Sequence, residues 1–156
     1  MDECVARAQK ELGAKASNLQ GFKDPKEFVD SLIKPRTVMF LVQAGSPVDQ
    51  SIDLFKGLLD EGDLLIDGGN EYFHNTRRRG QELEKAGLLY MGMGISGGEE
   101  GARNGPALMP GGPRTGFDRI QPIITSVAAQ TPFGPCTTYI GPDGSGNYVK
   151  MVHNGE

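Results

Sequence analysis

Apolar runs of strand length alternate with amphipathic stretches of helix length along most of this chain. Three of these runs are continuously apolar, at residues 37–42 (TVMFLV), 64–66 and 88–93. A strand that is apolar on both faces is typical of a parallel sheet with helices on each side. The three runs therefore predict three buried strands in one sheet.

Between these runs, the apolar residues take up helical spacing. Helices are predicted over residues 2–12, from Pro25 to the break at Pro35, from Ser46 through Leu59, over residues 73–85, along the stripe Phe117, Ile120, Ile124 and Val127, and from Ser145 onward. Residues 137–140 are predicted as a last short strand, and residues 95–112 as a glycine-rich loop. Because strands and helices alternate with short connections, we expect an α/β fold with a doubly wound, mostly parallel sheet.

Three short polar or glycine-rich segments follow the predicted strands. They are Val42–Gly45, Asp67–Asn70 and Ser96–Gly98. In an open parallel sheet, ligands bind at the carboxyl edge of the strands, and glycine lets backbone N–H groups come close to an anion. The segments predict a binding site at this edge; the alternative is that each is an ordinary turn between a strand and a helix.

The last predicted helix carries Lys150, His153 and Asn154 at positions i, i+3 and i+4, which places them on one face. A lysine that loses its charge on desolvation can serve as a general base near neutral pH. Histidine and asparagine beside it can hold hydroxyl or carboxylate oxygens. The alternative is a solvated polar stripe.

Composition narrows the classes of protein. With 156 residues, 37% hydrophobic and 23% charged, the chain is typical of one soluble globular domain. Its net charge of −4 disfavours nucleic acid as a partner, and its apolar runs are too short to cross a membrane. Cys4 and Cys136 have no metal-ligand spacing, so we expect no metal and a reducing, intracellular compartment. Arg77–Arg79 is interpreted as a solvated helix face, with a phosphate or partner site as the alternative.

Three long motifs occur in order along the chain. They are IDGGNEY (residues 66–72), GISGGEEGARNGPALMPGG (94–112) and GSGNYVKMVHNG (144–155). Together they resemble the 6-phosphogluconate dehydrogenase family, and the resemblance runs through essentially the whole chain. The sequence around Asn70–Glu71 and Gly101–Gly105 is similar to that of the plant and algal branch. The resemblance implies an NADP-dependent enzyme of the pentose phosphate pathway. Such an enzyme oxidises and decarboxylates 6-phosphogluconate to ribulose 5-phosphate and CO2, as a homodimer, in the cytoplasm or in a plastid.

The resemblance also implies roles for individual residues. Lys150 is the expected general base, which takes the proton of the C3 hydroxyl, and Asn154 is its catalytic neighbour. The implied substrate-binding residues are Asn70, Ser96, Gly97, Gly98, His153 and Asn154. The implied cofactor-binding residues are Val42, Gln43, Ala44 and Asn70.

The chain departs from the family pattern at several points. Gln43 stands where the family usually has lysine, which alters one cofactor contact. The family's general acid is a glutamate seven residues after the lysine. Glu156 comes six residues after Lys150, a shift that rotates it by about 100° on a helix, so the acid role is not assigned to it.

The family's phosphate-binding first turn, its NADP-selecting segment and its large helical domain have no counterpart in the chain. We therefore expect residues 1–143 to be a partial NADP-binding, Rossmann-like domain that lacks its first βαβ unit. Residues 144–156 are expected to be the first helix of a truncated all-helical domain, and the chain is expected to be inactive by itself.

Two alternatives remain. One is a β-hydroxyacid dehydrogenase of the same superfamily, with a smaller substrate such as 3-hydroxyisobutyrate; the wording GEEGARNGPALMPGG and KMVHNG argues against it. The other is a non-catalytic truncated product.

Overall fold

The computed structural model describes residues 2–155, and the chain divides into two compact units after Ile33. The first unit holds α1 (Asp2–Leu12), a short 3-10 helix η1 (Gly13–Asn18) and α2 (Pro25–Asp30). The Asp24 carboxylate accepts a hydrogen bond from the Glu27 N–H at 2.9 Å and so caps α2, as the sequence predicts.

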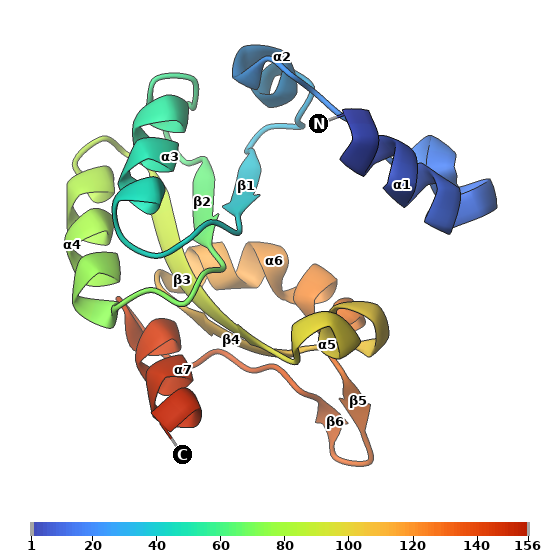
Figure 1. Ribbon diagram of the computed structural model, residues 1–156. Helices are drawn as coiled ribbons and strands as arrows, with labels where there is room; N and C mark the ends of the chain where they lie inside the picture. Colours follow the sequence, from blue (N-terminus) through green and yellow to red (C-terminus); the bar gives the residue numbers. More distant parts are fainter. Residues whose placement is uncertain (1, 156) are drawn as a thin grey trace. The chain divides into compact units, whose positions relative to one another are not determined.

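The second unit is an α/β structure built on a four-stranded sheet (Figure 1). Its strands are β1 (Thr37–Phe40), β2 (Leu64–Asp67), β3 (Leu89–Ser96) and β4 (Ala107–Gly111), in that spatial order. The first three pair in parallel, and β4 pairs antiparallel to β3. The helices are α3 (Ser46–Lys56), α4 (Phe73–Glu84), α5 (Gly98–Asn104), α6 (Arg114–Val127) and α7 (Ser145–Gly155), and β5 (Gln130–Thr131) pairs with β6 (Gly134–Pro135) in a small hairpin. The predicted α/β fold with a mostly parallel sheet is confirmed.

Helices cover both faces of this sheet. Alternate residues of β2 and β3 pack with α6 in the main apolar core, which contains Leu64, Ile66, Met91, Met93, Leu108, Phe117, Ile120 and Ile124. The opposite face of β3 packs against α4 and α7. The continuous apolar runs of the sequence therefore reflect burial on both faces, as predicted.

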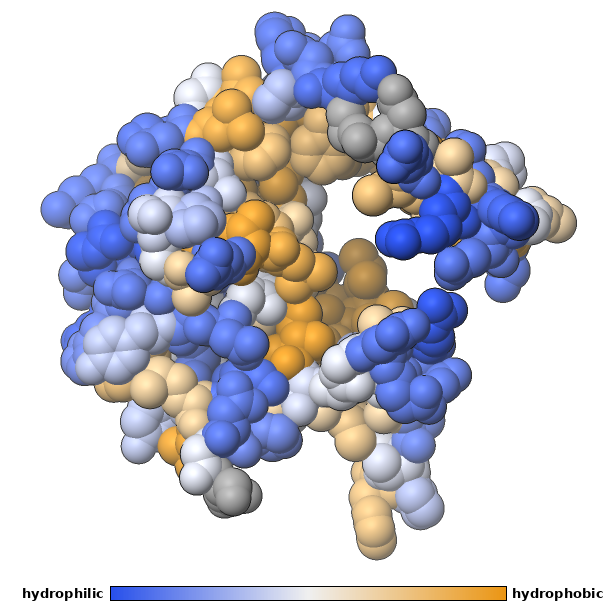
Figure 2. Space-filling view, in the orientation of Figure 1, coloured by the Kyte–Doolittle hydropathy of each residue, from blue (hydrophilic) through white to orange (hydrophobic). Residues whose placement is uncertain are grey.

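The α6 face of the sheet is open near β1. Met39 is 40% exposed and Leu41 is 69% exposed. Figure 2 shows apolar residues gathered over the same part of the sheet. This apolar surface lies where β1 approaches the carboxyl edge.

The glycine-rich segment is more regular than the predicted loop. β3 continues to Ser96, α5 follows, and residues 107–111 return as β4 beside β3. The predicted strand at residues 137–140 is wrong: two isolated bridges, from Thr137 to Leu108 and from Gly141 to Gly111, run along β4 instead. Pairing with β3 supplies the hydrogen bonds of β4, so its backbone is ordered without a conspicuous apolar pattern.

Glycines bring α7 unusually close to β3 and β4. A side chain at Gly146 would meet the carbonyl oxygens of Met109 and Gly92, and the nitrogen of Gly111 at 2.7 Å. A side chain at Gly94 would meet the Lys150 Cβ at 2.5 Å. The helix backbone therefore rests directly on the strand backbones, which fixes the depth of every side chain on its inner face.

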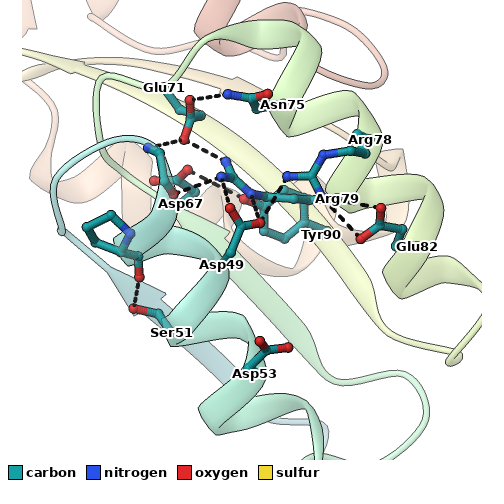
Figure 3. A network of polar contacts seen from close by, with 12 residues as sticks. Asp49, Ser51, Asp53, Asp67, Glu71, Asn75, Arg78, Arg79, Glu82 and Tyr90 are labelled. Atoms are coloured by element: carbon teal, nitrogen blue, oxygen red, sulfur yellow. Dashed lines mark hydrogen bonds and ion pairs between the residues drawn. The ribbon is translucent and has the colours of Figure 1, made fainter.

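A buried arginine joins the segments that follow β1 and β2 (Figure 3). Arg79 is 2% exposed and donates to Glu71 at 2.6 Å, to both oxygens of Asp49 at 2.8 Å, and to the Gly45 carbonyl at 2.9 Å. Its hydrogen bonds hold the pKa of Asp49 well below the ordinary value. The interpretation of Arg77–Arg79 as a solvated face is thus wrong for Arg79, because a helical face covers only part of three consecutive residues.

Replacement of Gly146 by alanine is expected to destabilise the fold by about 3 kcal/mol, because the added carbon meets backbone atoms that no rotamer change can move away. The matched control is Gly155→Ala on the same helix, where no atom lies within 4 Å of the added carbon. That control is expected to change the free energy of unfolding by less than about 0.5 kcal/mol, because Gly155 is the last residue of α7. Urea unfolding of both variants measures the difference, and equal stabilities would refute the close packing of α7.

Replacement of Arg79 by methionine is expected to lower the free energy of unfolding by about 3–5 kcal/mol, because it leaves the buried Glu71 carboxylate without its cation. Arg78→Met is the control: Arg78 is 47% exposed and also pairs with Asp49, at 3.0 Å. Its loss is expected to cost less than about 1 kcal/mol. If the two variants unfold at the same urea concentration, Arg79 does not hold these segments together.

Candidate active site

Helix α7 presents Lys150 at the carboxyl edge of the sheet. Lys150 is 7% exposed, and its first side-chain carbons lie over Gly94 of β3. A cavity of about 260 Å³ lies beside it, lined by Asn70, Glu71, Lys150, Met151, Asn154 and Gly155. The structure therefore brings Asn70, Lys150 and Asn154 together from segments some 80 residues apart.

Ser96 and His153 also meet at this edge. The Ser96 hydroxyl lies 3.4 Å from His153 Nε2, a long hydrogen bond between exposed groups. The end of β3 and the last turn of α7 are thus adjacent. Both side chains lie at the surface, where a ligand can reach them.

Gly97 and Gly98 allow the sharp turn from β3 into α5. Their φ angles are +136° and +56°, in the region that favours glycine. A side chain at Gly97 would also meet the Gly101 Cα at 2.7 Å. The two glycines therefore keep backbone accessible beside Ser96, and side chains there would block the turn.

The segment Val42–Ala44 leaves β1 at the same edge. A side chain at Gly69 would meet the Val42 carbonyl oxygen at 2.8 Å, so this segment lies directly against the one that contains Asn70. Gln43 and Ala44 are exposed. They can be reached by a ligand that lies across the end of β1.

Glu71 belongs to the site although the sequence analysis did not select it. Its carboxylate is 2% exposed and accepts hydrogen bonds from the Gly45 and Tyr72 N–H groups, at 2.9 and 2.7 Å. Burial alone would raise the pKa of Glu71, but the bonds that it accepts, that from Gly45 foremost, lower it below the ordinary value. A carboxylate held in place by hydrogen bonds thus lines the cavity. The sequence could have indicated Glu71 through its place in the motif IDGGNEY, next to Asn70.

Asp67 has the opposite electrostatics. It is completely buried at the end of β2, and burial raises the pKa of its carboxyl above the ordinary value. The Gly69 N–H donates to it at 2.9 Å, which partly offsets the effect of burial. Asp67 therefore stabilises the turn before Asn70 by accepting the hydrogen bond from Gly69.

The described residues offer no metal site. Among residues 2–155, no group of three histidine, cysteine, aspartate or glutamate side chains is placed to hold a metal ion. No helix in the same part of the chain is long and apolar enough to cross a membrane. The prediction that Glu156 is out of register stays untested, because Glu156 lies outside the described residues. The prediction that the chain binds no nucleic acid also stays untested.

Comparison with known proteins gives one consistent family. The model for the NAD binding domain of 6-phosphogluconate dehydrogenase matches residues 3–141. "6-Phosphogluconate dehydrogenase, decarboxylating 1" from Spinacia oleracea is 55% identical over 155 residues, which cover 99% of this chain and 32% of that protein. The protein of the same name from Oryza sativa is 57% identical over 158 residues, with the same coverage.

Solved structures agree with this assignment. Plasmodium falciparum 6-phosphogluconate dehydrogenase, known in its apo form, with NADP+ and with 6-phosphogluconate, superposes with a TM-score of 0.89 at 44% identity. It is covered by this chain over 32% of its length, and covers 99% of this chain. Mycobacterium tuberculosis 3-hydroxyisobutyrate dehydrogenase has a TM-score of 0.73 at 22% identity over 85% of this chain and 43% of that one, which shows a shared fold alone.

The match covers nearly all of this chain but only about a third of its curated relatives, 32% of the spinach and rice proteins. Fold, motifs and sequence identity all lead to the same assignment. The chain belongs to the 6-phosphogluconate dehydrogenase family.

Proposed function

We propose that this chain supplies the catalytic lysine, part of the substrate pocket and part of the cofactor site of an NADP-dependent dehydrogenase. The reaction is oxidation and decarboxylation of 6-phosphogluconate to ribulose 5-phosphate and CO2. The observation that carries the proposal is the shared cavity of Asn70, Lys150 and Asn154 at the carboxyl edge of a parallel sheet.

Lys150 is the general base. Its amine stands at the end of a side chain that is buried over Gly94, next to a cavity large enough for part of a sugar acid. A neutral amine there can take the proton of the C3 hydroxyl as the C3 hydrogen leaves as hydride. Asn154, one turn further along α7, can hold an oxygen of the same substrate with its amide.

The rim of the cavity provides further substrate contacts. Ser96 and His153 lie 3.4 Å apart and can each bind a hydroxyl or carboxylate oxygen. Gly97 and Gly98 are exposed and have no side chains, so their backbone N–H groups can approach an anionic ligand. Asn70 lies between this substrate region and the segment Val42–Ala44.

The cofactor region is formed by Val42, Gln43, Ala44 and Asn70. Gln43 and Ala44 are exposed at the end of β1, so the residues present fit a ligand laid across this edge. NADP, when bound, supplies the hydride acceptor. Gln43 brings a neutral amide where the family usually has a charged lysine, so its contact is a hydrogen bond without a full charge.

Membership of the family also supports a proposal about domains, assembly and compartment. We infer that residues 1–143 are part of an NADP-binding domain and that residues 144–156 begin a helical one, in a homodimeric enzyme. Relatives from Arabidopsis thaliana include chloroplastic forms, which supports either the cytoplasm or a plastid as the compartment.

Titration of the isotopically labelled chain with 6-phosphogluconate tests the pocket. We expect the amide signals of Asn70, Lys150 and Asn154 to shift, and Lys150→Met to weaken binding about 10- to 100-fold through loss of a hydrogen bond to the anionic ligand. The matched control is Lys56→Met, which removes an exposed lysine of α3 and is expected to bind normally. 3-Hydroxyisobutyrate serves as the competing substrate class. If it shifts these signals and 6-phosphogluconate does not, the proposed substrate is wrong.

The chain by itself is expected to form little or no NADPH from NADP and 6-phosphogluconate, because it spans only about a third of the length of its curated relatives. Absorbance of NADPH at high protein concentration measures this, with a full-length relative as the positive control. Turnover that disappears in Lys150→Met would show instead that the chain is sufficient for catalysis.

A further inference from the structure

Asn147 occupies the junction between α7 and the segment that carries Asn70. It is completely buried and precedes Lys150 by one helical turn, so the two share a face of α7. A side chain at Gly92 would meet the side-chain oxygen Oδ1 of Asn147, so β3 leaves just enough room for this amide. Asn147 is not among the residues that the sequence analysis selected.

Both ends of the Asn147 amide are used. Its Nδ2 donates to the Gly69 carbonyl at 3.3 Å, and its Oδ1 accepts from the Thr76 hydroxyl at 2.9 Å. A carbonyl oxygen can only accept, so the bond to Gly69 fixes which end of the amide faces which partner. These two hydrogen bonds, which we call the Asn147 bridge, join α7 to α4 and to the turn after β2.

Gly69 links the bridge to the rest of the site. It directly precedes Asn70, its N–H donates to Asp67, and a side chain on it would meet the Val42 carbonyl oxygen. The Gly69 carbonyl is therefore the point where the turn is held from the side of α7. Any shift of this carbonyl moves Asn70 relative to Lys150.

We propose that Asn147 is a positioning residue: it fixes the separation between Asn70 and Lys150, and thereby the geometry of the pocket between them. Its part in catalysis rests on the function proposed above, whereas the bridge itself is a property of this chain. Precise placement matters because a displacement of about 1 Å can change a catalysed rate about 100-fold.

The decisive variant is Asn147→Asp, which has the same shape. When ionised, the introduced carboxylate still accepts from Thr76 but has no proton to donate to the Gly69 carbonyl. When protonated, it can make both bonds again. We therefore expect the Gly69 and Asn70 amide signals of this variant to be displaced at high pH and to return toward those of the wild type as the pH falls.

Affinity should follow the same course. At high pH, 6-phosphogluconate is expected to bind the variant about tenfold more weakly than the wild type, the ratio that one lost hydrogen bond to a buried group gives, with recovery at low pH. The wild type, measured at each pH, corrects for titration of Asp67, Glu71, His153 and the ligand itself. A residue that merely stabilises the fold would make the urea midpoint of the variant depend on pH but would leave the affinity of the folded protein unchanged.

A second pair of variants keeps the test decisive if Asn147→Asp does not fold. Thr76→Val removes the hydroxyl that orients the amide but keeps the shape, and Thr76→Ser keeps the hydroxyl. We expect displaced Asn70 signals and weaker binding for the valine variant, and near wild-type behaviour for the serine variant.

The possible outcomes are distinct. Asn70 signals that match the wild type in Asn147→Asp and Thr76→Val would overturn the bridge. Displaced signals with unchanged affinity would overturn the positioning role. A wild-type chain that binds no 6-phosphogluconate would overturn the proposed function and the positioning role with it, while the ligand-free signals would still decide whether the bridge exists.

Discussion

The contact of the α7 backbone with the backbones of β3 and β4 is the constraint on which the site depends. Helices normally stand off a sheet by the thickness of their side chains. Here Gly92, Gly94, Gly111 and Gly146 remove those side chains from both surfaces. The backbone of α7 therefore lies directly on the sheet, and the Lys150 side chain lies close to the backbone of β3 at Gly94.

A second constraint acts on the segments that face α7. Arg79 holds Glu71 and Asp49, and so fixes the turns after β2 and β1 with charged hydrogen bonds inside the fold. The ionised Glu71 and the Asp67 carboxyl with its raised pKa stand four residues apart and support the same turn by different means. Two kinds of contact therefore hold the residues around the cavity. Backbone contact with β3 and β4 holds α7, and the ion pairs of Arg79 hold the turns after β1 and β2.

The sequence predicted the parallel part of this architecture well and its polar interior poorly. Continuous apolar runs located β1, β2 and β3, because burial on both faces leaves a mark that one sequence can show. β4 was missed since glycine and proline dominate residues 105–112, and its order comes from pairing with β3. Glu71, Arg79 and Asn147 were not predicted as buried, because whether a polar side chain finds partners depends on residues remote in the chain. Lys150 and Asn70 were selected as candidates through motifs, and the structure brings them to one cavity.

The sequence separation of the Asn147 bridge has a consequence for how the molecule acquires its site. Its partners Thr76 and Gly69 lie 71 and 78 residues before it along the chain. Contacts between such distant residues repay the entropy of loop closure only after most of the intervening chain is in place. We therefore expect the pocket to be among the last features to form, so that a ligand that needs both Asn70 and Lys150 binds the completely folded molecule in preference to partly folded ones.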